Sequence, residues 1–347
     1  MKNSNKDSKV LVTGGAGFIA VHCIIKLLQQ GYTVRTTLRS LNRVNEVKEM
    51  LCNGGINSFE NLSFIEADLK EDKNWNDAVK DCTYVLHVAS PTPAIQFEHE
   101  DEIIKPAREG VLRVLKAARD ANVKRVVLTS AYGAIGCGHR NRTTPYTEQD
   151  WTDLSADLHP YQKSKTLAEI AAWDFIKKEG GALELSTVNP VAVMGPVLGT
   201  DYSHSNQILR RMLEGELEAC PKIESCYVDV RDVADLHVLA MTKPEAKGER
   251  FLATTGNALS MLEVANILRS RLGEDAAKVP TSEIANWKLR AAALLKPDLK
   301  MVVTLLGQYA QASGEKAGKL LHWSPRTNEE AIIATAESML KLGLIKK

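Results

Sequence analysis

The sequence has no long apolar segment and almost no net charge. None of its 347 residues lies in an apolar run of about 20 residues, the length that a membrane-spanning helix requires. The polar start MKNSNKDSK leads into a strand-like run without the apolar core of a secretory signal. Lysine and arginine total 44 against 43 for aspartate and glutamate, so no basic surface is predicted for nucleic acid or an anionic membrane. We predict a cytoplasmic protein that binds a small molecule, and neither a membrane nor nucleic acid.

Paired metal-ligand spacings are also missing. The six cysteines are dispersed without a C-x-x-C pair, which predicts reduced thiols rather than a disulfide framework or a zinc site. His99, Glu100, Asp101 and Glu102 are adjacent, but acidic residues at the start of a helix are explained by the helix dipole. No metal is predicted.

Short apolar runs alternate with amphipathic stretches through the first half of the chain. Parallel strands need crossover connections, so this alternation predicts an α/β fold, a Rossmann-type doubly wound parallel sheet with helices on both faces. Beyond about residue 190 the alternation loosens, which predicts a smaller, mostly C-terminal substrate-binding lobe. Strands are expected at 9–13, 32–38, 62–67, 84–90, 124–130 and 183–189, and helices at 18–30, 43–51, 75–80, 101–120 and 161–178.

The segment VLVTGGAGFIAVH, residues 10–22, places a glycine turn between the first strand and the first helix. Gly14, Gly17 and Ala20 form G-x-x-G-x-x-A, and small residues there let the backbone approach a pyrophosphate at the helix N-terminus. The alternative is a simple strand-to-helix turn. The βα context favours a dinucleotide site, so we predict a cofactor domain over 1–190, with returns to the sheet around 226–255, and a lobe that is mainly substrate-binding over 191–347.

The end of the second strand indicates which dinucleotide binds. No aspartate or glutamate occupies residues 35–40, whereas Arg39 stands there and Arg43 follows one helical turn later. An acid would bind the ribose of NAD, and a cation would bind the 2′-phosphate of NADP. The pattern favours NADPH, the alternative being that both arginines belong only to a solvated helix start.

The segment YQKSK places Tyr161 and Lys165 four residues apart, and no other tyrosine has a lysine at that spacing. On a helix the two side chains share a face. An adjacent ammonium stabilises a phenolate, so we expect Lys165 to lower the pKa of Tyr161 and the pair to deliver a proton to a carbonyl oxygen. The alternative is an ordinary exposed helix.

TGGAGFIA, HVASP at 87–91, VVLTS at 126–130, YQKSKTLAE at 161–169 and VDVRDVADLHVLAM at 228–241 resemble the extended short-chain dehydrogenase/reductases. Within them the chain resembles the dihydroflavonol-reductase-like group of NADPH-dependent aldehyde and ketone reductases. The resemblance implies that Tyr161 donates the proton and that Lys165 also holds the nicotinamide ribose. It implies cofactor contacts by Gly14, Gly17, Phe18 and Ile19 at the pyrophosphate, by Arg39 and Arg43 at the 2′-phosphate, by Asp68 and Leu69 at the adenine, by Pro190, Val191, Ala192 and Val193 near the nicotinamide, and by Val88, Ala89, Ser90 and Thr129.

One position departs from that family. A catalytic serine usually follows the fifth strand as the second serine of Thr-Ser-Ser, whereas this chain reads Thr129, Ser130, Ala131. We predict that Ser130 replaces it, although side chains alternate along a strand, so Thr129 would share the face of Ala131.

The sequence therefore predicts NADPH-dependent reduction of an aldehyde or ketone carbonyl to an alcohol. Two alternatives remain open, a regulatory protein that senses NADP, for which Ala131 is the hint, and a nucleotide-sugar epimerase or dehydratase, for which a second basic cluster is not evident. The substrate pocket is expected between the second lobe and the loops 91–100, 137–160 and 195–225. The sequence makes no prediction of an oligomeric state.

Overall fold

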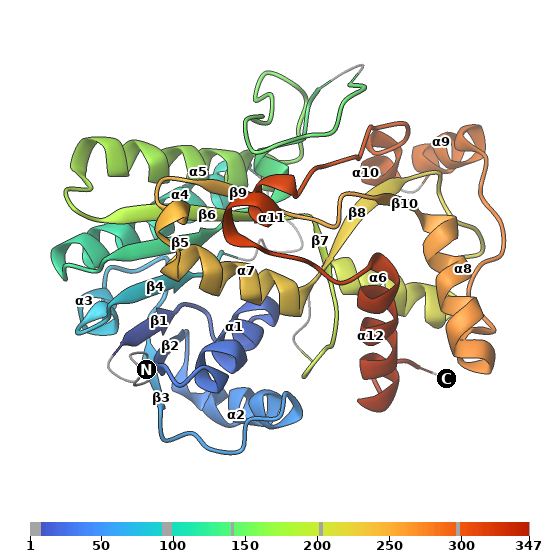
Figure 1. Cartoon of the computed structure of the whole chain (residues 1–347). Helices are drawn as coiled ribbons and strands as arrows, with labels where there is room; N and C mark the ends of the chain where they lie inside the picture. The colour runs from blue at the N-terminus through green and yellow to red at the C-terminus, as the bar shows by residue number, and fades with distance from the viewer. Residues whose placement is uncertain (1–7, 92–98, 140–141, 201–203, 296–298, 347) are drawn as a thin grey trace.

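A seven-stranded parallel sheet forms the centre of the computed structural model, which describes residues 8–91, 99–139, 142–200, 204–295 and 299–346 (Figure 1). The strand order is β3-β2-β1-β4-β5-β6-β9, and each neighbouring pair is parallel. The predicted α/β doubly wound sheet is confirmed. Its strands are β1 (Lys9–Val12), β2 (Thr33–Leu38), β3 (Leu62–Glu66), β4 (Tyr84–His87), β5 (Arg125–Thr129), β6 (Glu184–Pro190) and β9 (Arg250–Ala253).

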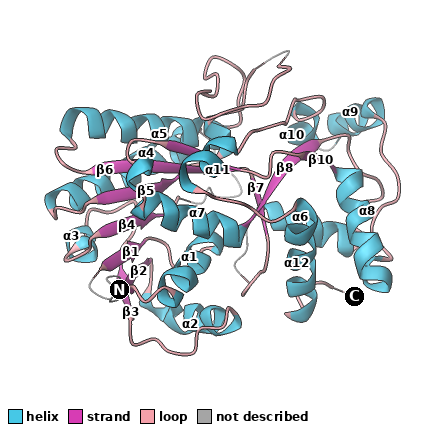
Figure 2. Cartoon of the chain, viewed as in Figure 1, coloured by secondary structure: helices cyan, strands magenta, loops and turns pink. Residues whose placement is uncertain are grey.

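Helices cover both faces of this sheet (Figure 2). Side chains alternate along β1, so Val10 and Val12 join one hydrophobic cluster while Leu11 joins the other. The first cluster lies under α1, α2 and α7, and the second lies under α3, α4 and α5. Their bounds are α1 (Phe18–Gln29), α2 (Val44–Asn53), α3 (Trp75–Val79), α4 (Asp101–Asp120), α5 (Pro160–Glu179) and α7 (Val230–Thr242).

A smaller lobe is built on a three-stranded sheet of order β10-β8-β7, in which β8 is parallel to β7 and antiparallel to β10. Buried side chains of β7, α6, α8 and α12 form a third hydrophobic cluster there. The expected substrate loops fall partly outside the described residues, at 92–98, 140–141 and 201–203. The elements are β7 (Ala192–Met194), α6 (His204–Leu213), β8 (Glu224–Asp229), β10 (Ala258–Ser260), α8 (Met261–Leu272), α9 (Asn286–Leu295), α10 (Leu299–Thr304), α11 (Glu315–Leu321) and α12 (Asn328–Lys341).

The chain passes between the two sheets more than once. After β6 it enters the small sheet, and β9 then returns to the large sheet by pairing with β6 in parallel. The expected return at 226–255 thus contains β8, which belongs to the small sheet, and β9, which belongs to the large one. The last strand of the large sheet is therefore supplied by chain that follows part of the smaller lobe.

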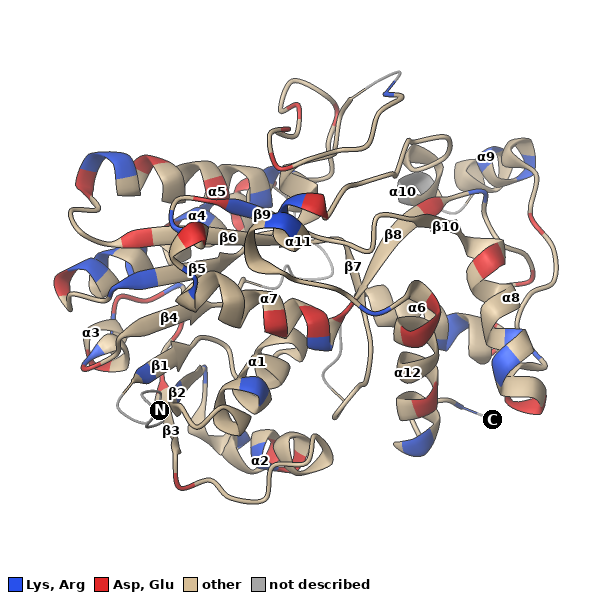
Figure 3. Ribbon diagram, in the orientation of Figure 1, with Lys and Arg blue, Asp and Glu red and all other residues tan. Residues whose placement is uncertain are grey.

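Charged residues of both signs are interspersed along the helices of both lobes (Figure 3). Over the ranges given above, no helix is both long enough and apolar enough to cross a membrane. Within the same ranges, no three His, Cys, Asp or Glu side chains come together as metal ligands would. All six cysteines carry free thiols.

Candidate active site

The turn between β1 and α1 brings backbone N–H groups to the carboxyl edge of the sheet. Gly14 has a φ of +72°, and a Cβ there would lie 2.9 Å from the Cβ of Ala89, so glycine is needed for both conformation and space. Gly17 precedes α1, which no side chain of the described residues caps. The first N–H groups of the helix, at Phe18 and Ile19, have no partner within it and favour an anion. This turn fits a pyrophosphate.

The end of β4 forms the wall opposite this turn. The backbone N–H of Ala89 donates to the Thr13 hydroxyl at 2.9 Å, and that hydroxyl contacts Nδ1 of His87 at 2.9 Å. Burial lowers the pKa of His87 to about 3, so its ring is neutral at neutral pH. Segment 88–90 thus lies beside the glycines where the strand order reverses between β1 and β4, the position at which such sheets bind dinucleotides.

Both arginines predicted to meet a 2′-phosphate follow β2. Arg39 comes directly after the strand and is exposed. Arg43 ends a 3-10 helix, η2 (Leu41–Arg43), and its Nε and Nη2 donate to Glu46 at 2.8 and 2.7 Å. These hydrogen bonds lower the pKa of Glu46. Arg43 is therefore engaged with a carboxylate of α2, whereas Arg39 faces solvent.

Asp68 and Leu69 follow β3, at the same edge of the sheet. The Asp68 carboxylate accepts from the backbone N–H of Lys70 at 2.9 Å, and its carbonyl oxygen accepts from the Trp75 indole at 3.1 Å. Leu69 is buried against Gly110 of α4. A Cβ added at Gly110 would lie only 2.9 Å from the Cβ of Leu69. These contacts fix the loop expected to flank the adenine.

Three consecutive residues at the end of β5 have different environments. Thr129 contacts Nε2 of His237 on α7 at 2.6 Å, whereas the Ser130 hydroxyl donates to Oε2 of Glu169 on α5 at 2.5 Å. The two side chains therefore point to opposite faces of the sheet, as strand alternation predicts. Ala131 remains extended, at φ −158° and ψ 160°, before the 3-10 helix η3 (Tyr132–Ala134).

Helix α5 begins one residue before the predicted tyrosine. Pro160 occupies its first turn, and the His159 side chain accepts from the backbone N–H of Tyr161 while Gln162 completes a capping box. One turn later, the Lys165 ammonium lies 5.9 Å from the centre of the Tyr161 ring. The structure thus brings together the two groups that the spacing predicted.

The pKa values of this pair differ from the sequence expectation in one respect. Tyr161 leaves 40% of its surface exposed, yet its hydroxyl is enclosed enough that burial raises its pKa, with a further increase from nearby Cys137. The expected lowering by Lys165 is wrong for this structure, because desolvation is the largest influence. Burial also lowers the pKa of Lys165 to about 8, against an opposing effect of Glu169. At neutral pH the pair is a protonated phenol beside an ammonium.

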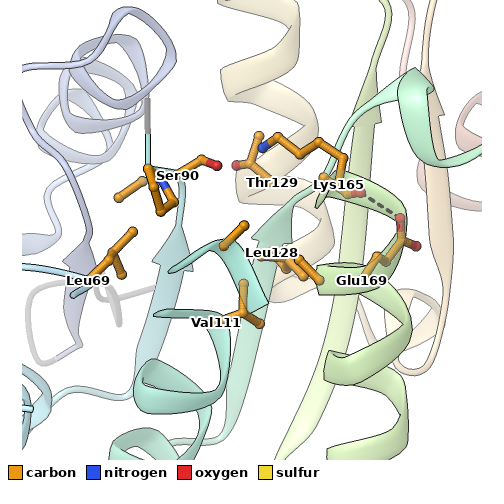
Figure 4. Close-up of a pocket in the computed structure, with 12 residues that line it drawn as sticks. Leu69, Ser90, Val111, Leu128, Thr129, Lys165 and Glu169 are labelled. Carbon is orange, nitrogen blue, oxygen red and sulfur yellow. Dashed lines mark hydrogen bonds between the residues drawn. The ribbon is translucent and has the colours of Figure 1, made fainter. Parts of the chain in front are cut away.

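A narrow pocket adjoins Lys165 at the ends of β4 and β5. The Lys165 side chain extends across it toward Thr129, with Ser90 on the opposite side (Figure 4). Its walls come from both the predicted cofactor segments and α4 and α5. The lining residues include Leu69, Ala89, Ser90, Thr129, Ser130, Lys165 and Glu169.

Residues 190–193, predicted near the nicotinamide, connect the two sheets. Pro190 ends β6, and the backbone N–H of Val191 donates to the carbonyl of Ala253 on β9 at 3.2 Å. Because β6 pairs with β5 in parallel, segment 190–193 begins at the sheet edge where Ser130 lies.

Sequence reasoning missed the buried carboxylate of this region. Glu169 is fully buried and pairs with Arg250 at 2.7 Å. A signal was available, because Glu169 falls four residues after Lys165 on the same face of a helix. Its partner lies on β9, and nothing local in the sequence connects the two.

A parallel sheet in this order, with a dinucleotide turn after β1 and a tyrosine–lysine pair on the helix after β5, is the arrangement of nicotinamide-dependent short-chain dehydrogenases and reductases. The chain belongs to the NAD dependent epimerase/dehydratase family, whose model matches residues 10–253. The predicted resemblance to the extended short-chain dehydrogenase/reductases is confirmed.

Several proteins that are similar to this chain in sequence or in structure are named as reductases. The chain is 32% identical over 281 residues to dihydroflavonol 4-reductase of Zea mays, covering 78% of this chain and 76% of that protein. It is 32% identical over 309 residues to cinnamoyl-CoA reductase CAD2 of Medicago truncatula, covering 85% and 93%. Among solved structures it resembles the yeast methylglyoxal/isovaleraldehyde reductase Gre2 complexed with NADPH, with a TM-score of 0.80, 27% identity and coverage of 96% of this chain and 99% of that one.

Proposed function

We propose that this protein reduces an aldehyde or ketone carbonyl to an alcohol with NADPH. The observation that carries the proposal is the Tyr161–Lys165 pair on α5, with the ammonium 5.9 Å from the phenol ring. Similar proteins that are named as reductases, one of them complexed with NADPH, support the same activity. When bound, NADPH supplies a hydride to the carbonyl carbon.

The cofactor would be held along the carboxyl edge of the sheet. The uncapped start of α1 after Gly17 binds the pyrophosphate, and Arg39 beyond β2 binds the 2′-phosphate. Asp68 and Leu69 flank the adenine, and segment 190–193 borders the nicotinamide. Lys165 reaches the ribose from α5.

Tyr161 acts as the proton donor to the carbonyl oxygen. Its raised pKa keeps the phenol protonated at neutral pH, which is the form that reduction requires. The phenolate left after transfer forms beside the Lys165 ammonium, which lies 5.9 Å from the ring centre. Desolvation still keeps the net pKa of Tyr161 above its ordinary value.

Ser130 remains our prediction for a second hydrogen bond to the carbonyl. The Ser130 hydroxyl donates its hydrogen to Glu169, with 2.5 Å between Oγ and Oε2. To donate to a substrate carbonyl instead, the hydroxyl must rotate away from that carboxylate. Ala131, on the face of Thr129, has no hydroxyl to offer.

The first test is NADPH oxidation with a panel of aldehydes, ketones, keto esters and dihydroflavonols, with UDP-glucose as the epimerase control. We expect turnover of at least one carbonyl and none of UDP-glucose. Interconversion of UDP-glucose without NADPH oxidation would favour the epimerase alternative. Binding of NADPH without turnover of any member would favour the regulatory one.

The second test is Tyr161→Phe. Loss of a general acid typically costs about 10²–10⁴-fold in rate, so we expect kcat to fall by that order while NADPH affinity stays unchanged. Tyr84→Phe is the matched control, because Lys124 lies 5.9 Å from the Tyr84 ring, the same distance as in the Tyr161–Lys165 pair. A Tyr161→Phe enzyme with the turnover of its control contradicts the assignment.

A further inference from the structure

Tyr161, Lys165 and Glu169 form one line along a face of α5, each one turn from the next. Tyr161 is 40% exposed, whereas Glu169 is completely buried. The line therefore runs from the edge of the site into the interior. A carboxylate is rarely buried there without compensation.

Glu169 is saturated with hydrogen-bond donors from several strands. Its Oε2 accepts from Ser130 of the β5 end at 2.5 Å and from Nδ2 of Asn189 on β6 at 2.7 Å. Its Oε1 accepts from Nε of Arg250 on β9 at 2.7 Å. Longer contacts of 3.3 Å come from Thr187 and Trp173. One carboxylate thus joins α5 to β5, β6 and β9.

Arg250 is itself held by contacts of Nη1 and of the guanidinium plane, whereas its buried Nη2 has no hydrogen-bond partner among the described residues. Its Nη1 donates to the backbone carbonyls of Glu148 and Asp150 at 2.6 and 2.8 Å. Its guanidinium stacks on the Trp151 ring, 3.8 Å from the ring centre. The cation is therefore fixed by backbone and ring, and it fixes Glu169 in turn.

We propose that Glu169 is a positioning residue of the reductase site, holding the Lys165 turn of α5 in register with the Ser130 end of β5 and supplying the negative charge behind the ammonium. The inference rests on the proposed function for its kinetic consequence. The geometry carries it, because Ser130 bonds Glu169 directly and Lys165 precedes it by one turn.

Several groups face Lys165 from the surrounding elements. Tyr161 of α5 is protonated, His87 of β4 is neutral with a pKa near 3, and Thr129 of β5 is uncharged. Glu169 is the acidic group that raises the pKa of Lys165, against the desolvation that lowers it to about 8. Removing its charge, with Arg250 left in place, should lower that pKa further.

The test compares Glu169→Gln with Glu184→Gln. Glu184 pairs with the buried Arg125 at 2.7 Å, and this pair lies at the opposite end of β5 and β6. Like Arg250, Arg125 also donates to backbone carbonyls. Both variants remove a carboxylate from a buried arginine, so both should lose stability. Only Glu169→Gln should move the alkaline limb of kcat/KM, by about one pH unit toward acid. If the alkaline limb of Glu169→Gln lies at the same pH as the alkaline limb of Glu184→Gln, the proposal is overturned.

A second readout needs no substrate. Lysines are reductively methylated with ¹³C, Lys165→Arg identifies the Lys165 signal, and that signal is titrated by NMR. We expect it to titrate at lower pH in Glu169→Gln than in the wild type or Glu184→Gln, and an unmoved midpoint overturns the proposal. If the wild type reduces no carbonyl, the proposed function fails while this titration still decides the role of Glu169.

Glu169→Gln leaves a buried guanidinium without its anion, which is itself destabilising. If that variant does not fold, the double variant Glu169→Gln/Arg250→Met removes both charges, with Glu184→Gln/Arg125→Met as its control. Because the double variant also lacks the Arg250 cation, Arg250→Met alone is its reference in the same NMR titration. Equal Lys165 midpoints in Arg250→Met and Glu169→Gln/Arg250→Met overturn the proposal.

Discussion

At the scale of single residues, the two arginines after β2 differ in what already binds them. Arg43 gives two hydrogen bonds to Glu46, so a phosphate that reaches it competes with a carboxylate. Arg39 is exposed directly after the strand. Arg39 is therefore the better placed of the two to discriminate between NADPH and NADH.

Arg39→Asp should collapse or reverse the preference for NADPH. Charge-assisted hydrogen bonds to a phosphate are worth about 1.5–3 kcal/mol, or roughly ten- to 150-fold, and the new carboxylate adds repulsion. The measurement is kcat/KM with each cofactor. Arg290→Asp, the same change at an exposed position of α9, controls for net charge. A wild type that uses both cofactors equally, or a ratio that Arg39→Asp leaves in place, would mean that Arg39 does not bind the phosphate.

At the scale of elements, the end of β5 divides its hydroxyls between two helices. Thr129 contacts α7 through His237, and Ser130 contacts α5 through Glu169. Ala131 continues the extended backbone and so returns to the side of Thr129. A hydroxyl at 131 would therefore lie on the opposite face from the Glu169 network.

Ser130→Ala should lower kcat by about 10²–10³-fold if Ser130 bonds the carbonyl, the usual cost of losing one such donor. Adding Ala131→Ser to the same chain should not restore that loss, because a hydroxyl at 131 lies on the face opposite to that of Ser130. Urea unfolding of each variant separates the other contribution, because loss of the Glu169 contact alone is worth about 1 kcal/mol. A Ser130→Ala enzyme that loses stability and keeps its kcat would assign the hydroxyl to the network alone.

The first half of the fold could be predicted because each element there carries its own periodicity. The helix expected at 161–178 is observed as Pro160–Glu179, and the strand expected at 9–13 as Lys9–Val12. Tyr161 and Lys165 could be predicted for the same reason, since their relation is local. The elements β7 and β10 have three residues each, too few for a pattern. The Glu169–Arg250 pair spans 81 residues and depends on strand order, which the spacing of residues does not contain.

At the scale of the whole molecule, neutral histidines are buried in different layers. His22 lies on α1, His87 on β4 and His237 on α7. Burial is the largest influence on each, and it lowers their pKa values to about 4, 3 and 4. Each histidine therefore favours the folded state only while it stays unprotonated.

Acid should destabilise the protein well above the range in which carboxylates titrate. Because the folded pKa values lie below the unfolded value of about 6.5, this contribution is complete above pH 6.5 and is lost as pH falls toward 4. Together the three groups give a slope of at most about 4 kcal/mol per pH unit. Urea unfolding at pH 7, 6 and 5 measures it, and His22→Asn should remove about a third of the slope. The exposed His99→Asn should leave it intact, and a flat profile between pH 7 and 5 contradicts the prediction.

The placement of Arg250 has a consequence for how the protein is made. The chain completes α5 and β6, passes through β7 and β8, and only then supplies the guanidinium on β9 that neutralises Glu169. During synthesis from the ribosome, α5 with Glu169 therefore emerges well before Arg250, its counterion. A fragment that ends at Pro190 must either bury the Glu169 carboxylate without its cation or leave that face of α5 away from the sheet. We therefore expect division of the chain between its two lobes to weaken the docking of α5 on the sheet, because β9 supplies the cation that pairs with Glu169.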